Sequence, residues 1–304
     1  MYVIKMKTII YYLAIIVVSL VSIGIIRIYE NPATPTTAVQ TAENPTPQSS
    51  ALLFDSNKKS EIDVPILMYH NIFRSSNAHG DYIISESAFE EDLKFLSKNG
   101  YTTIVMQDLI DYTMGKGNLP DKPIVLTFDD GYFNNFAYAF PLLQKYNSKA
   151  VISIIGYYTD LYTKSPDENP SYSHVTWPNI KEMMTSGLVE FQNHSYNLHT
   201  TDKGRNGTKK KRGESLADYK AVLTTDLGKM QDAFTSNTNY TPTTFTYPFG
   251  SVSNDSFDII KELGFKASLS CESGMNHVSR DPECLYMMKR YLRTPKKSAE
   301  VLLK

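Results

Sequence analysis

Short apolar runs alternate with segments of helical periodicity from Glu61 to the C-terminus. This alternation is typical of repeated β-α units, in which the strands lie parallel and helices cover the sheet. The runs predict strands at 65–69, 101–105, 124–128, 150–155, 188–192, 244–247, 266–269 and 285–289. We therefore expect an α/β fold, an irregular (β/α)7-type barrel of parallel strands rather than a sandwich.

Several predicted helices have clear start or stop signals. Ser87 begins S-A-F-E, a capping-box sequence, and Gly100 ends the helix that follows. Ser215 opens the clearest amphipathic helix, in which apolar residues step by three or four as far as Phe234. Further helices are predicted at 136–146, 178–185 and 257–263.

Polar or backbone-exposing residues follow four of the predicted strands. His70 follows the first strand, Asp129 and Asp130 follow the third, His194 follows the fifth and residues 248–250 follow the sixth. Active sites of parallel β/α barrels lie at the carboxyl ends of the strands. We therefore expect these residues to meet on one rim.

The sequence TFDDG, residues 127–131, places two adjacent carboxylates at the end of an apolar strand. Alone, Asp-Asp-Gly is more often a solvated turn, but the strand before it favours a functional pair. Adjacent side chains diverge, so one carboxylate can hold a metal while the other takes a proton.

Two histidines in HSYNLH, residues 194–199, are candidate metal ligands. A lone histidine is more often structural. Together with Asp130, however, His194 and His199 match an open three-ligand site that leaves a position for water. Their spacing would set the rings about 140° apart on a regular helix, so we expect a loop or a distorted turn here.

These motifs together resemble the metal-dependent polysaccharide deacetylases, the NodB-like carbohydrate esterase family 4, over residues 65–293. The resemblance implies that Asp129 is the general base. The metal ligands that it implies are Asp130, His194 and His199, for a divalent metal that we expect to be zinc, with cobalt, nickel or iron as alternatives. It also implies an enzyme that hydrolyses N-acetyl groups of a cell-wall or surface polysaccharide, either peptidoglycan or poly-N-acetylglucosamine.

The histidine motif has one residue more than the family pattern H-[S/T]-x-x-H, a spacing that is similar to a branch including poly-N-acetylglucosamine deacetylases. In that branch the barrel is circularly permuted, so the strand bearing the catalytic acid comes first. LMYH, residues 67–70, resembles the displaced motif and implies that His70 is the general acid. His277 is the alternative.

The family sequence R-x-P-Y-G is here TYPFG, residues 246–250, so the arginine that orients the base is missing. Phe249 can still offer a backbone N–H to the oxyanion. Arg290, in MMKRYLR, either replaces the missing arginine by facing Asp129 or is an exposed cation at a strand end. The residues expected to contact the substrate are Tyr132, Tyr247 and Pro248.

Two other functions remain open for such a chain. The missing arginine and the displaced acid favour a catalytically inactive, carbohydrate-binding scaffold on the cell surface. A glycosidase that uses Asp129 and Asp130 fits poorly, because its working carboxyls must lie about 5 Å or more apart across a bond and the histidines would have no role.

The first sixty residues differ in kind from the rest. Residues 8–26 are uncharged, follow two lysines and are long enough to cross about 30 Å of hydrocarbon. We expect a membrane anchor at 1–30, a Pro/Thr-rich linker at 31–60 and the deacetylase domain at 61–304. A cleaved signal peptide is the alternative. The prediction is a single-pass protein of the cell membrane with its catalytic domain extracellular.

The charge is nearly balanced, with 31 Lys and Arg against 32 Asp and Glu, so no strong field attracts nucleic acid. The expected partners are the polysaccharide and the membrane, and we expect a monomer. Cys271 and Cys284 lack metal-type spacing. An exported domain permits a disulfide between them, and two free thiols are an equal alternative.

Overall fold

Eight parallel strands form the central sheet of the computed structural model, which describes residues 61–74 and 80–304. Along the sheet their order is β10 (Ala267–Leu269), β9 (Thr244–Thr246), β8 (Val189–Asn193), β7 (Ala150–Ile154), β6 (Pro123–Asp130), β2 (Ile66–Tyr69) and β12 (Tyr291–Leu292). The eighth strand, β5 (Thr102–Ile104), pairs with the beginning of β6. The predicted α/β class with parallel strands is confirmed.

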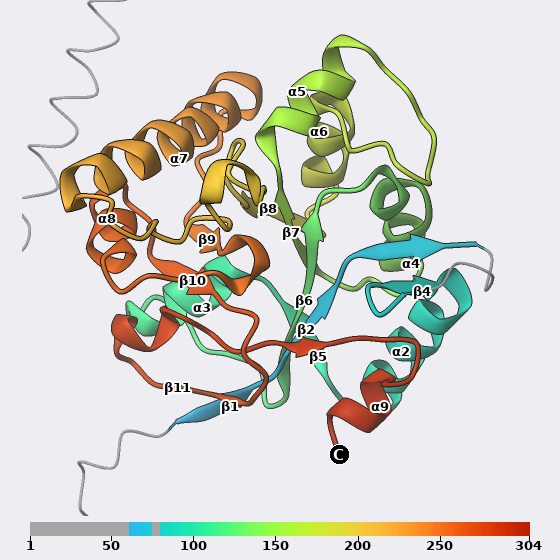
Figure 1. The fold of residues 1–304 in the computed structure, drawn as a ribbon. Coiled ribbons are helices and arrows are strands. Elements are labelled where there is room, and N and C mark those ends of the chain that lie inside the picture. The colour runs from blue at the N-terminus through green and yellow to red at the C-terminus, as the bar shows by residue number, and fades with distance from the viewer. Residues whose placement is uncertain (1–60, 75–79) are drawn as a thin grey trace, which may run out of the picture. The chain divides into compact units, whose positions relative to one another are not determined.

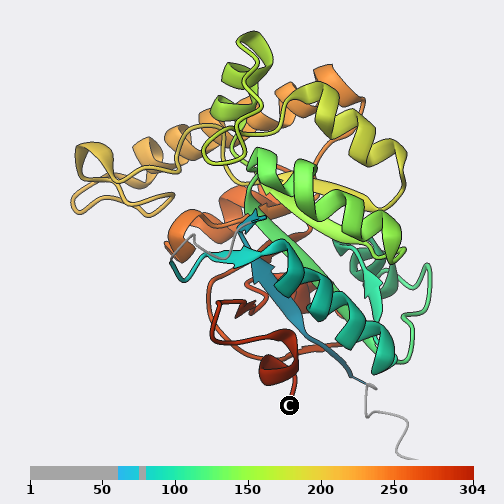
Figure 2. The ribbon, with the colours of Figure 1, turned by 90° about the vertical axis from the view of Figure 1, so that its right-hand side faces the viewer.

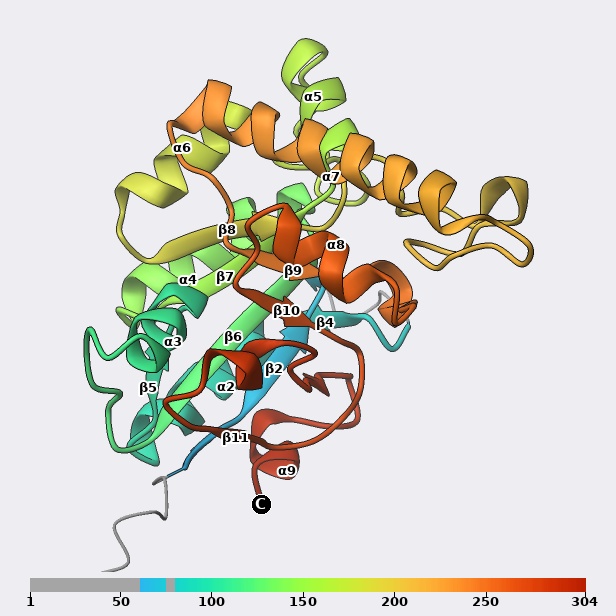
Figure 3. The ribbon, with the colours of Figure 1, turned by 90° about the vertical axis from the view of Figure 1, so that its left-hand side faces the viewer.

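The sheet curls so that its two edges approach each other. Its C-terminal segment pairs with β2 through β12 and also forms a parallel bridge from Met288 to Leu269, at the end of β10. Figure 3 shows this segment, in red, beside β2 and β10. The result is a curled, barrel-like sheet whose strand ends face a common centre.

Helices cover the outside of the curled sheet, with α2, α4 and α6 on one flank and α7 and α8 on the other (Figure 1). The helices are α2 (Glu86–Lys98), α3 (Met106–Thr113), α4 (Phe140–Lys145), α5 (Gly156–Lys164), α6 (Trp177–Thr185), α7 (Leu216–Thr238), α8 (Ser256–Glu262) and α9 (Ala299–Leu302). A π-helical turn, Asn135–Ala139, leads into α4. Figure 2 shows α2, in teal, beside this green turn and helix.

Two small ladders lie outside the central sheet. β1 (Ile62–Val64) pairs antiparallel with β11 (Asn276–Val278). β3 (Asn71–Phe73) pairs parallel with β4 (Ile83–Ser85), directly after the end of β2. The second ladder therefore lies beside the carboxyl end of the central sheet.

The two faces of β6 have different surroundings. Leu126 and Phe128 pack into the large apolar core beneath the helices. Side chains alternate along a strand, so Val125, Thr127 and Asp129 point into the interior of the curled sheet. Val125 belongs to an apolar cluster there, whereas Thr127 and Asp129 are buried polar residues. The interior thus becomes polar toward the carboxyl ends of the strands.

The predicted start of α2 is wrong by two residues. Its N-cap is Ser85 rather than Ser87, because the Ser85 Oγ accepts the Ala88 N–H at 3.1 Å. Glu90, expected to complete a capping box, instead pairs with Lys145 on α4 at 2.6 Å. A contact between helices has replaced the predicted local one.

The predicted strand at 285–289 is also wrong. A 3-10 turn ends at Leu285, and only Met288 bridges to the sheet. The Arg290 N–H bonds to the Glu272 carbonyl at 2.7 Å rather than to a neighbouring strand, so the regular pairing begins only at β12.

No helix within residues 61–74 and 80–304 has both the length and the apolar character needed to cross a membrane. The predicted anchor at 8–26 and the linker at 31–60 lie outside the described residues. Both cysteines, Cys271 and Cys284, are free.

Candidate active site

The carboxyl ends of the strands surround a cleft of about 630 Å³. Its lining includes most of the predicted site residues, namely His70, Asp129, Asp130, Tyr132, His194, His199 and Phe249. These residues come from the ends of β2, β6, β8 and β9 or from the loops that follow them. The rim on which they were expected to meet is therefore present.

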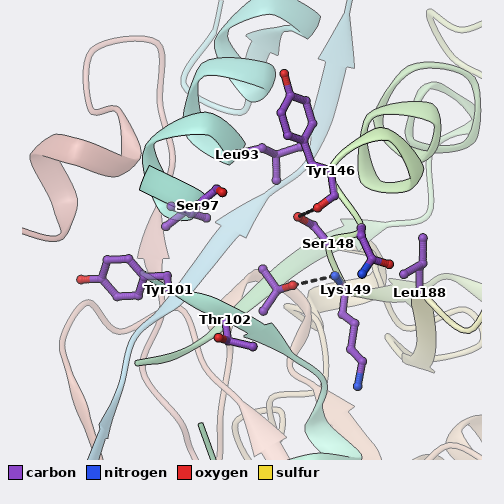
Figure 4. Close-up of a pocket in the computed structure, with 11 residues that line it drawn as sticks. Leu93, Ser97, Tyr101, Thr102, Tyr146, Ser148, Lys149 and Leu188 are labelled. Atoms are coloured by element: carbon purple, nitrogen blue, oxygen red, sulfur yellow. Dashed lines mark hydrogen bonds between the residues drawn. The ribbon is translucent and has the colours of Figure 1, made fainter. Parts of the chain in front are cut away.

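A smaller cavity of about 310 Å³ lies at the other end of the sheet, where β5, β7 and β8 begin. Figure 4 shows Thr102, Ser148 and Lys149 around it, and the Lys149 N–H donates to the Thr103 Oγ1 at 2.7 Å. Lys149 is the one charged side chain in this lining, and it pairs with Asp108 at 3.3 Å. This cavity brings no group of catalytic side chains together.

Asp130, His194 and His199 converge in the cleft, with one potential ligand atom of each within 4.8 Å of the others. The Asp130 Oδ1 lies 3.4 Å from the His194 Nε2 and 3.3 Å from the His199 Nε2. Asp130 and His194 are buried, while His199 is half-buried. The three atoms thus share one point that remains accessible from the cleft.

The hydrogen bonding of His194 indicates that this point suits a cation. Its Nδ1 lies 2.8 Å from the Thr246 carbonyl oxygen, which accepts only from a protonated nitrogen. When the ring is neutral, the Nε2 presents a lone pair to the Asp130 Oδ1, a buried atom without a hydrogen-bond partner among the described residues. Two facing lone pairs are stabilised by a shared cation, so these residues fit a divalent metal.

Backbone geometry after β6 explains why two adjacent carboxylates reach one cleft. β6 extends to Asp130, two residues farther than predicted. Neighbouring side chains on a regular strand point to opposite faces, but Asp130 (φ 71°) and Gly131 (φ 71°) are left-handed and break this alternation. A Cβ on Gly131 would lie 2.6 Å from the Ile154 Cγ2, so the turn requires glycine.

Arg290 holds Asp129 through two hydrogen bonds. Its Nη1 donates to the Asp129 Oδ1 at 2.7 Å and its Nη2 to the Oδ2 at 2.8 Å, while its Nε donates to the Ser270 carbonyl at 2.7 Å. Arg290 is fully buried, so its interpretation as an exposed cation is wrong. Burial by itself would raise the pKa of Asp129, but the charge and hydrogen bonds of Arg290 hold that pKa below its usual value. Asp129 is therefore ionised at neutral pH.

His70 also approaches Asp129, at the Oδ2 that the Arg290 Nη2 contacts. Its Nε2 is 3.9 Å from the Asp129 Oδ2, and its ring packs edge-on against Tyr82, with the centroids 4.7 Å apart. Burial lowers the pKa of His70, an effect that Asp129 opposes. The alternative acid, His277, lies on β11 in an exposed pair with Asp63 and does not line the cleft.

The remaining predicted residues are divided between the cleft and the core. Phe249 has a left-handed backbone (φ 57°), and its half-exposed ring lies 4.1 Å from that of His199. Tyr132 lines the cleft. Tyr247 is fully buried with its hydroxyl 2.8 Å from the Ser256 Oγ, and Pro248 is also buried. The side chains of these last two residues do not reach the cleft.

Several supporting groups gave no signal in the sequence. The Thr246 carbonyl orients His194, and the Thr127 hydroxyl joins the Ser270 carbonyl in binding Arg290. These groups are backbone atoms or short side chains, which the folded sheet alone brings close. Cys271 also lines the cleft, with its Sγ 3.9 Å from the Arg290 Nη2.

A family model described as polysaccharide deacetylase matches residues 116–268. The chain belongs to the polysaccharide deacetylase family. The poly-beta-1,6-N-acetyl-D-glucosamine N-deacetylase of Escherichia coli (strain K12) is 27% identical over 232 residues, which make up 70% of this chain and 34% of that protein. The protein of the same name from Staphylococcus aureus (strain N315) is 28% identical over 201 residues, 66% of this chain and 65% of that protein. The chain thus spans less than two thirds of the length of either relative.

Solved structures of other deacetylases have the same fold as this polysaccharide deacetylase domain. A de-N-acetylase from Aggregatibacter actinomycetemcomitans is 25% identical with a TM-score of 0.67, covering 79% of this chain and 98% of that one. The Streptococcus pyogenes deacetylase PplD, solved in complex with acetate, is 25% identical with a TM-score of 0.66, covering 80% and 97%. IcaB from Ammonifex degensii is 25% identical with a TM-score of 0.64, covering 80% and 98%.

Proposed function

We propose that this chain removes N-acetyl groups from poly-N-acetylglucosamine. The observation that carries the proposal is the ionised Asp129, held by a buried Arg290 beside the site formed by Asp130 and two histidines. Buried titratable groups with shifted pKa values that line a cleft beside a metal-type site are typical of catalytic centres, so the arrangement favours an enzyme over an inactive scaffold. The names of the curated relatives support poly-N-acetylglucosamine as the substrate.

Asp130, His194 and His199 would hold the metal, which we propose is zinc, because two imidazoles and one carboxylate suit that ion. When bound, the metal supplies Lewis-acid polarisation of the acetamide carbonyl and favours the ionisation of water.

The protein residues around this site divide the proton transfers between them. Asp129 accepts a proton from the attacking water, and the Phe249 N–H donates a hydrogen bond to the carbonyl oxygen as it gains charge. His70 donates a proton to the amide nitrogen as the carbon–nitrogen bond breaks, which yields acetate and a free amino sugar. Arg290 acts through Asp129 as a positioning residue. His70 directly follows β2, the first strand of the central sheet along the chain, and this position supports a circularly permuted barrel.

We also propose where the reaction takes place. The apolar segment at 8–26 would hold the enzyme in the cell membrane as a single-pass protein, with the catalytic domain on the outside and acting as a monomer. Protease added to intact cells should then remove the domain and leave the anchor; complete protection in intact cells would contradict this orientation.

The substrate can be tested by measuring acetate release from the full-length, zinc-loaded chain. We expect release from β-1,6-linked N-acetylglucosamine oligomers and much slower release from purified peptidoglycan. Release from peptidoglycan alone would support N-deacetylation but overturn poly-N-acetylglucosamine as the substrate. No release from either substrate would overturn the proposed function.

A further inference from the structure

Five aromatic side chains among the described residues are at least 36% exposed, and all five follow carboxyl ends of the strands. Tyr82 and Phe249 line the cleft itself. Tyr157, Tyr158 and Tyr172, here called the rim platform, lie on α5 and on the loop after it. Since soluble proteins rarely expose clustered aromatic groups, this distribution marks an interaction surface beside the cleft.

The rim platform lies next to the loop that carries the metal-site histidines. α5 begins where β7 ends and stands above the carboxyl end of the sheet (Figures 1 and 3). The Gly156 N–H donates to the Ser195 carbonyl at 3.2 Å, and the Tyr157 N–H donates to the Tyr196 carbonyl at 2.8 Å. The first turn of α5 is therefore fixed to the HSYNLH loop.

Ring contacts connect the rim platform to the cleft. Tyr132, which lines the cleft, lies 4.7 Å from His174 between ring centroids. His174 in turn stacks on Tyr158 at 4.4 Å with an interplanar angle of 16°. The main chains also pair, with the Phe133 N–H donating to the Ser173 carbonyl at 2.7 Å. The loop that carries Tyr172 is thus anchored to the residues directly after the Asp-Asp pair.

His174 is the centre of this stack but takes no part in the proposed reaction. It is 6% exposed, and its Nδ1 has no hydrogen-bond partner in the part of the chain that the structure describes. Burial lowers its pKa to about 4, so the ring is uncharged at neutral pH. This neutral, flat ring packs between Tyr132 and Tyr158 and so holds α5 against the residues that follow the Asp-Asp pair.

We propose that the rim platform binds sugar rings next to the one being deacetylated, on the same polysaccharide chain; this inference rests on the proposed function. The cleft holds the reacting acetamide, and a polymer must continue past it. Tyrosine offers a rigid apolar face for the C–H face of a sugar ring and a hydroxyl for its polar groups. The platform would therefore make the enzyme favour long chains over short ones.

The charges around the platform favour a polysaccharide over a lipid surface. The segment at 156–172 contains one lysine, Lys164, against Asp160, Asp167 and Glu168. Segments that bind anionic bilayers are rich in Lys and Arg. An acidic aromatic surface suits a neutral sugar polymer and equally the cationic amino sugars that deacetylation produces.

Titration calorimetry on the full-length chain tests the platform independently of turnover. The variant combining Tyr158→Ala and Tyr172→Ala should bind a β-1,6-linked N-acetylglucosamine hexamer about tenfold more weakly than the wild type, because two stacking faces are lost. Affinity for the dimer should change by less than about twofold. Tyr172→Ala alone, which removes a half-exposed ring, should give part of the loss without a change in melting temperature.

Two control variants distinguish the loss of ring stacking from a general loss of structure. The double variant Tyr158→Phe and Tyr172→Phe keeps the ring faces and should keep hexamer binding. Met114→Ala removes an exposed apolar side chain that does not line the cleft and should have no effect. Unchanged hexamer binding in the double alanine variant, or an equal loss for dimer and hexamer, would overturn the inference.

Two further results distinguish a failure of this inference from a failure of the proposed function. If the wild-type chain binds the hexamer through the platform but releases no acetate, the proposed function fails and the platform stands. If the double alanine variant instead loses binding to phosphatidylglycerol vesicles while hexamer binding is unchanged, the platform is a lipid surface and the inference fails.

Discussion

At the scale of single residues, two buried arginines three positions apart offer a matched test of the proposed base. Arg290 pairs with Asp129 in the cleft, and Arg293 pairs with Asp92 outside it, each at 2.7 Å. Arg290→Ala removes the strongest influence that lowers the pKa of Asp129, so the effect of burial should raise that pKa. The acidic limb of the kcat/KM profile should therefore move to higher pH.

Arg293→Ala is the control for this shift. Breaking either buried pair costs about 3–5 kcal/mol, so both variants should unfold more easily. Only Arg290→Ala should move the acidic limb, because the Arg293 side chain bonds to Asp92 and the Thr294 carbonyl and not to Asp129. Equal profiles for the two variants would show that Arg290 has a purely structural role.

The proposed acid gives a second test at this scale. His70→Asn should lower kcat by about 10²–10⁴-fold, since protonation of the leaving nitrogen is lost. Its metal content, measured by elemental analysis, should equal that of the wild type, because His70 is not among the converging ligands. His277→Asn should leave both quantities unchanged; a comparable loss of kcat there would reverse the assignment.

The residues of the site could be predicted where the sequence places several functional types in one short motif. TFDDG and HSYNLH contain the three converging ligands and Asp129, and both motifs lie at strand ends. Arg290 could be named as the partner of Asp129 only as one of two alternatives, because it lies 161 positions away and reaches Asp129 only through the closure of the sheet. Tyr247 was misleading because its position two residues before Phe249 says nothing about which way its side chain points.

At the scale of single elements, the turn after β6 is the most constrained. Gly131 and Gly187 are both left-handed, with φ of 71° and 72°. A Cβ would clash with Ile154 at Gly131, whereas none of the described atoms lies within 4 Å at Gly187. Gly187→Ala should therefore cost only the left-handed penalty of about 1–2 kcal/mol.

Gly131→Ala should cost more than Gly187→Ala in urea unfolding, because the clash adds to the same backbone penalty. It should also weaken metal binding, since Asp130 takes its direction from this turn. Equal stabilities for the two variants, together with unchanged metal affinity, would mean that the turn does not set the position of Asp130.

Elements with strong local signals were predicted and the others were not. α7 follows from apolar residues spaced over 23 positions and an N-cap serine. α5 has no side-chain cap, and its apolar residues face solvent, so periodicity gave no indication of it. β12 is two residues long and cannot show an alternating pattern.

At the scale of the whole molecule, the C-terminal segment closes the sheet and is held by Asp92 on α2. The Asp92 carboxylate accepts from the Arg293 Nε at 2.7 Å, from the Ala299 N–H at 2.9 Å and from the Tyr69 hydroxyl at 3.2 Å. Asp92→Ala should lower the free energy of unfolding by about 3–5 kcal/mol, because Arg293 is left buried without its partner.

Glu90, which is also on α2, provides the comparison through its exposed pair with Lys145 of α4. Glu90→Ala should have a far smaller effect in the same urea titration, since exposed ion pairs contribute little. If the two variants lose similar stability, the C-terminal segment is not held through Asp92.

The central claim is that Asp129 transfers the proton while Asp130 and the histidines bind the metal. The most direct measurement is acetate release and metal content of Asp129→Asn in the full-length chain. Acetate release from N-acetylglucosamine oligomers should fall by about 10²–10⁴-fold, and metal per chain should match the wild type. Wild-type acetate release, or a loss of metal together with activity, would contradict the claim.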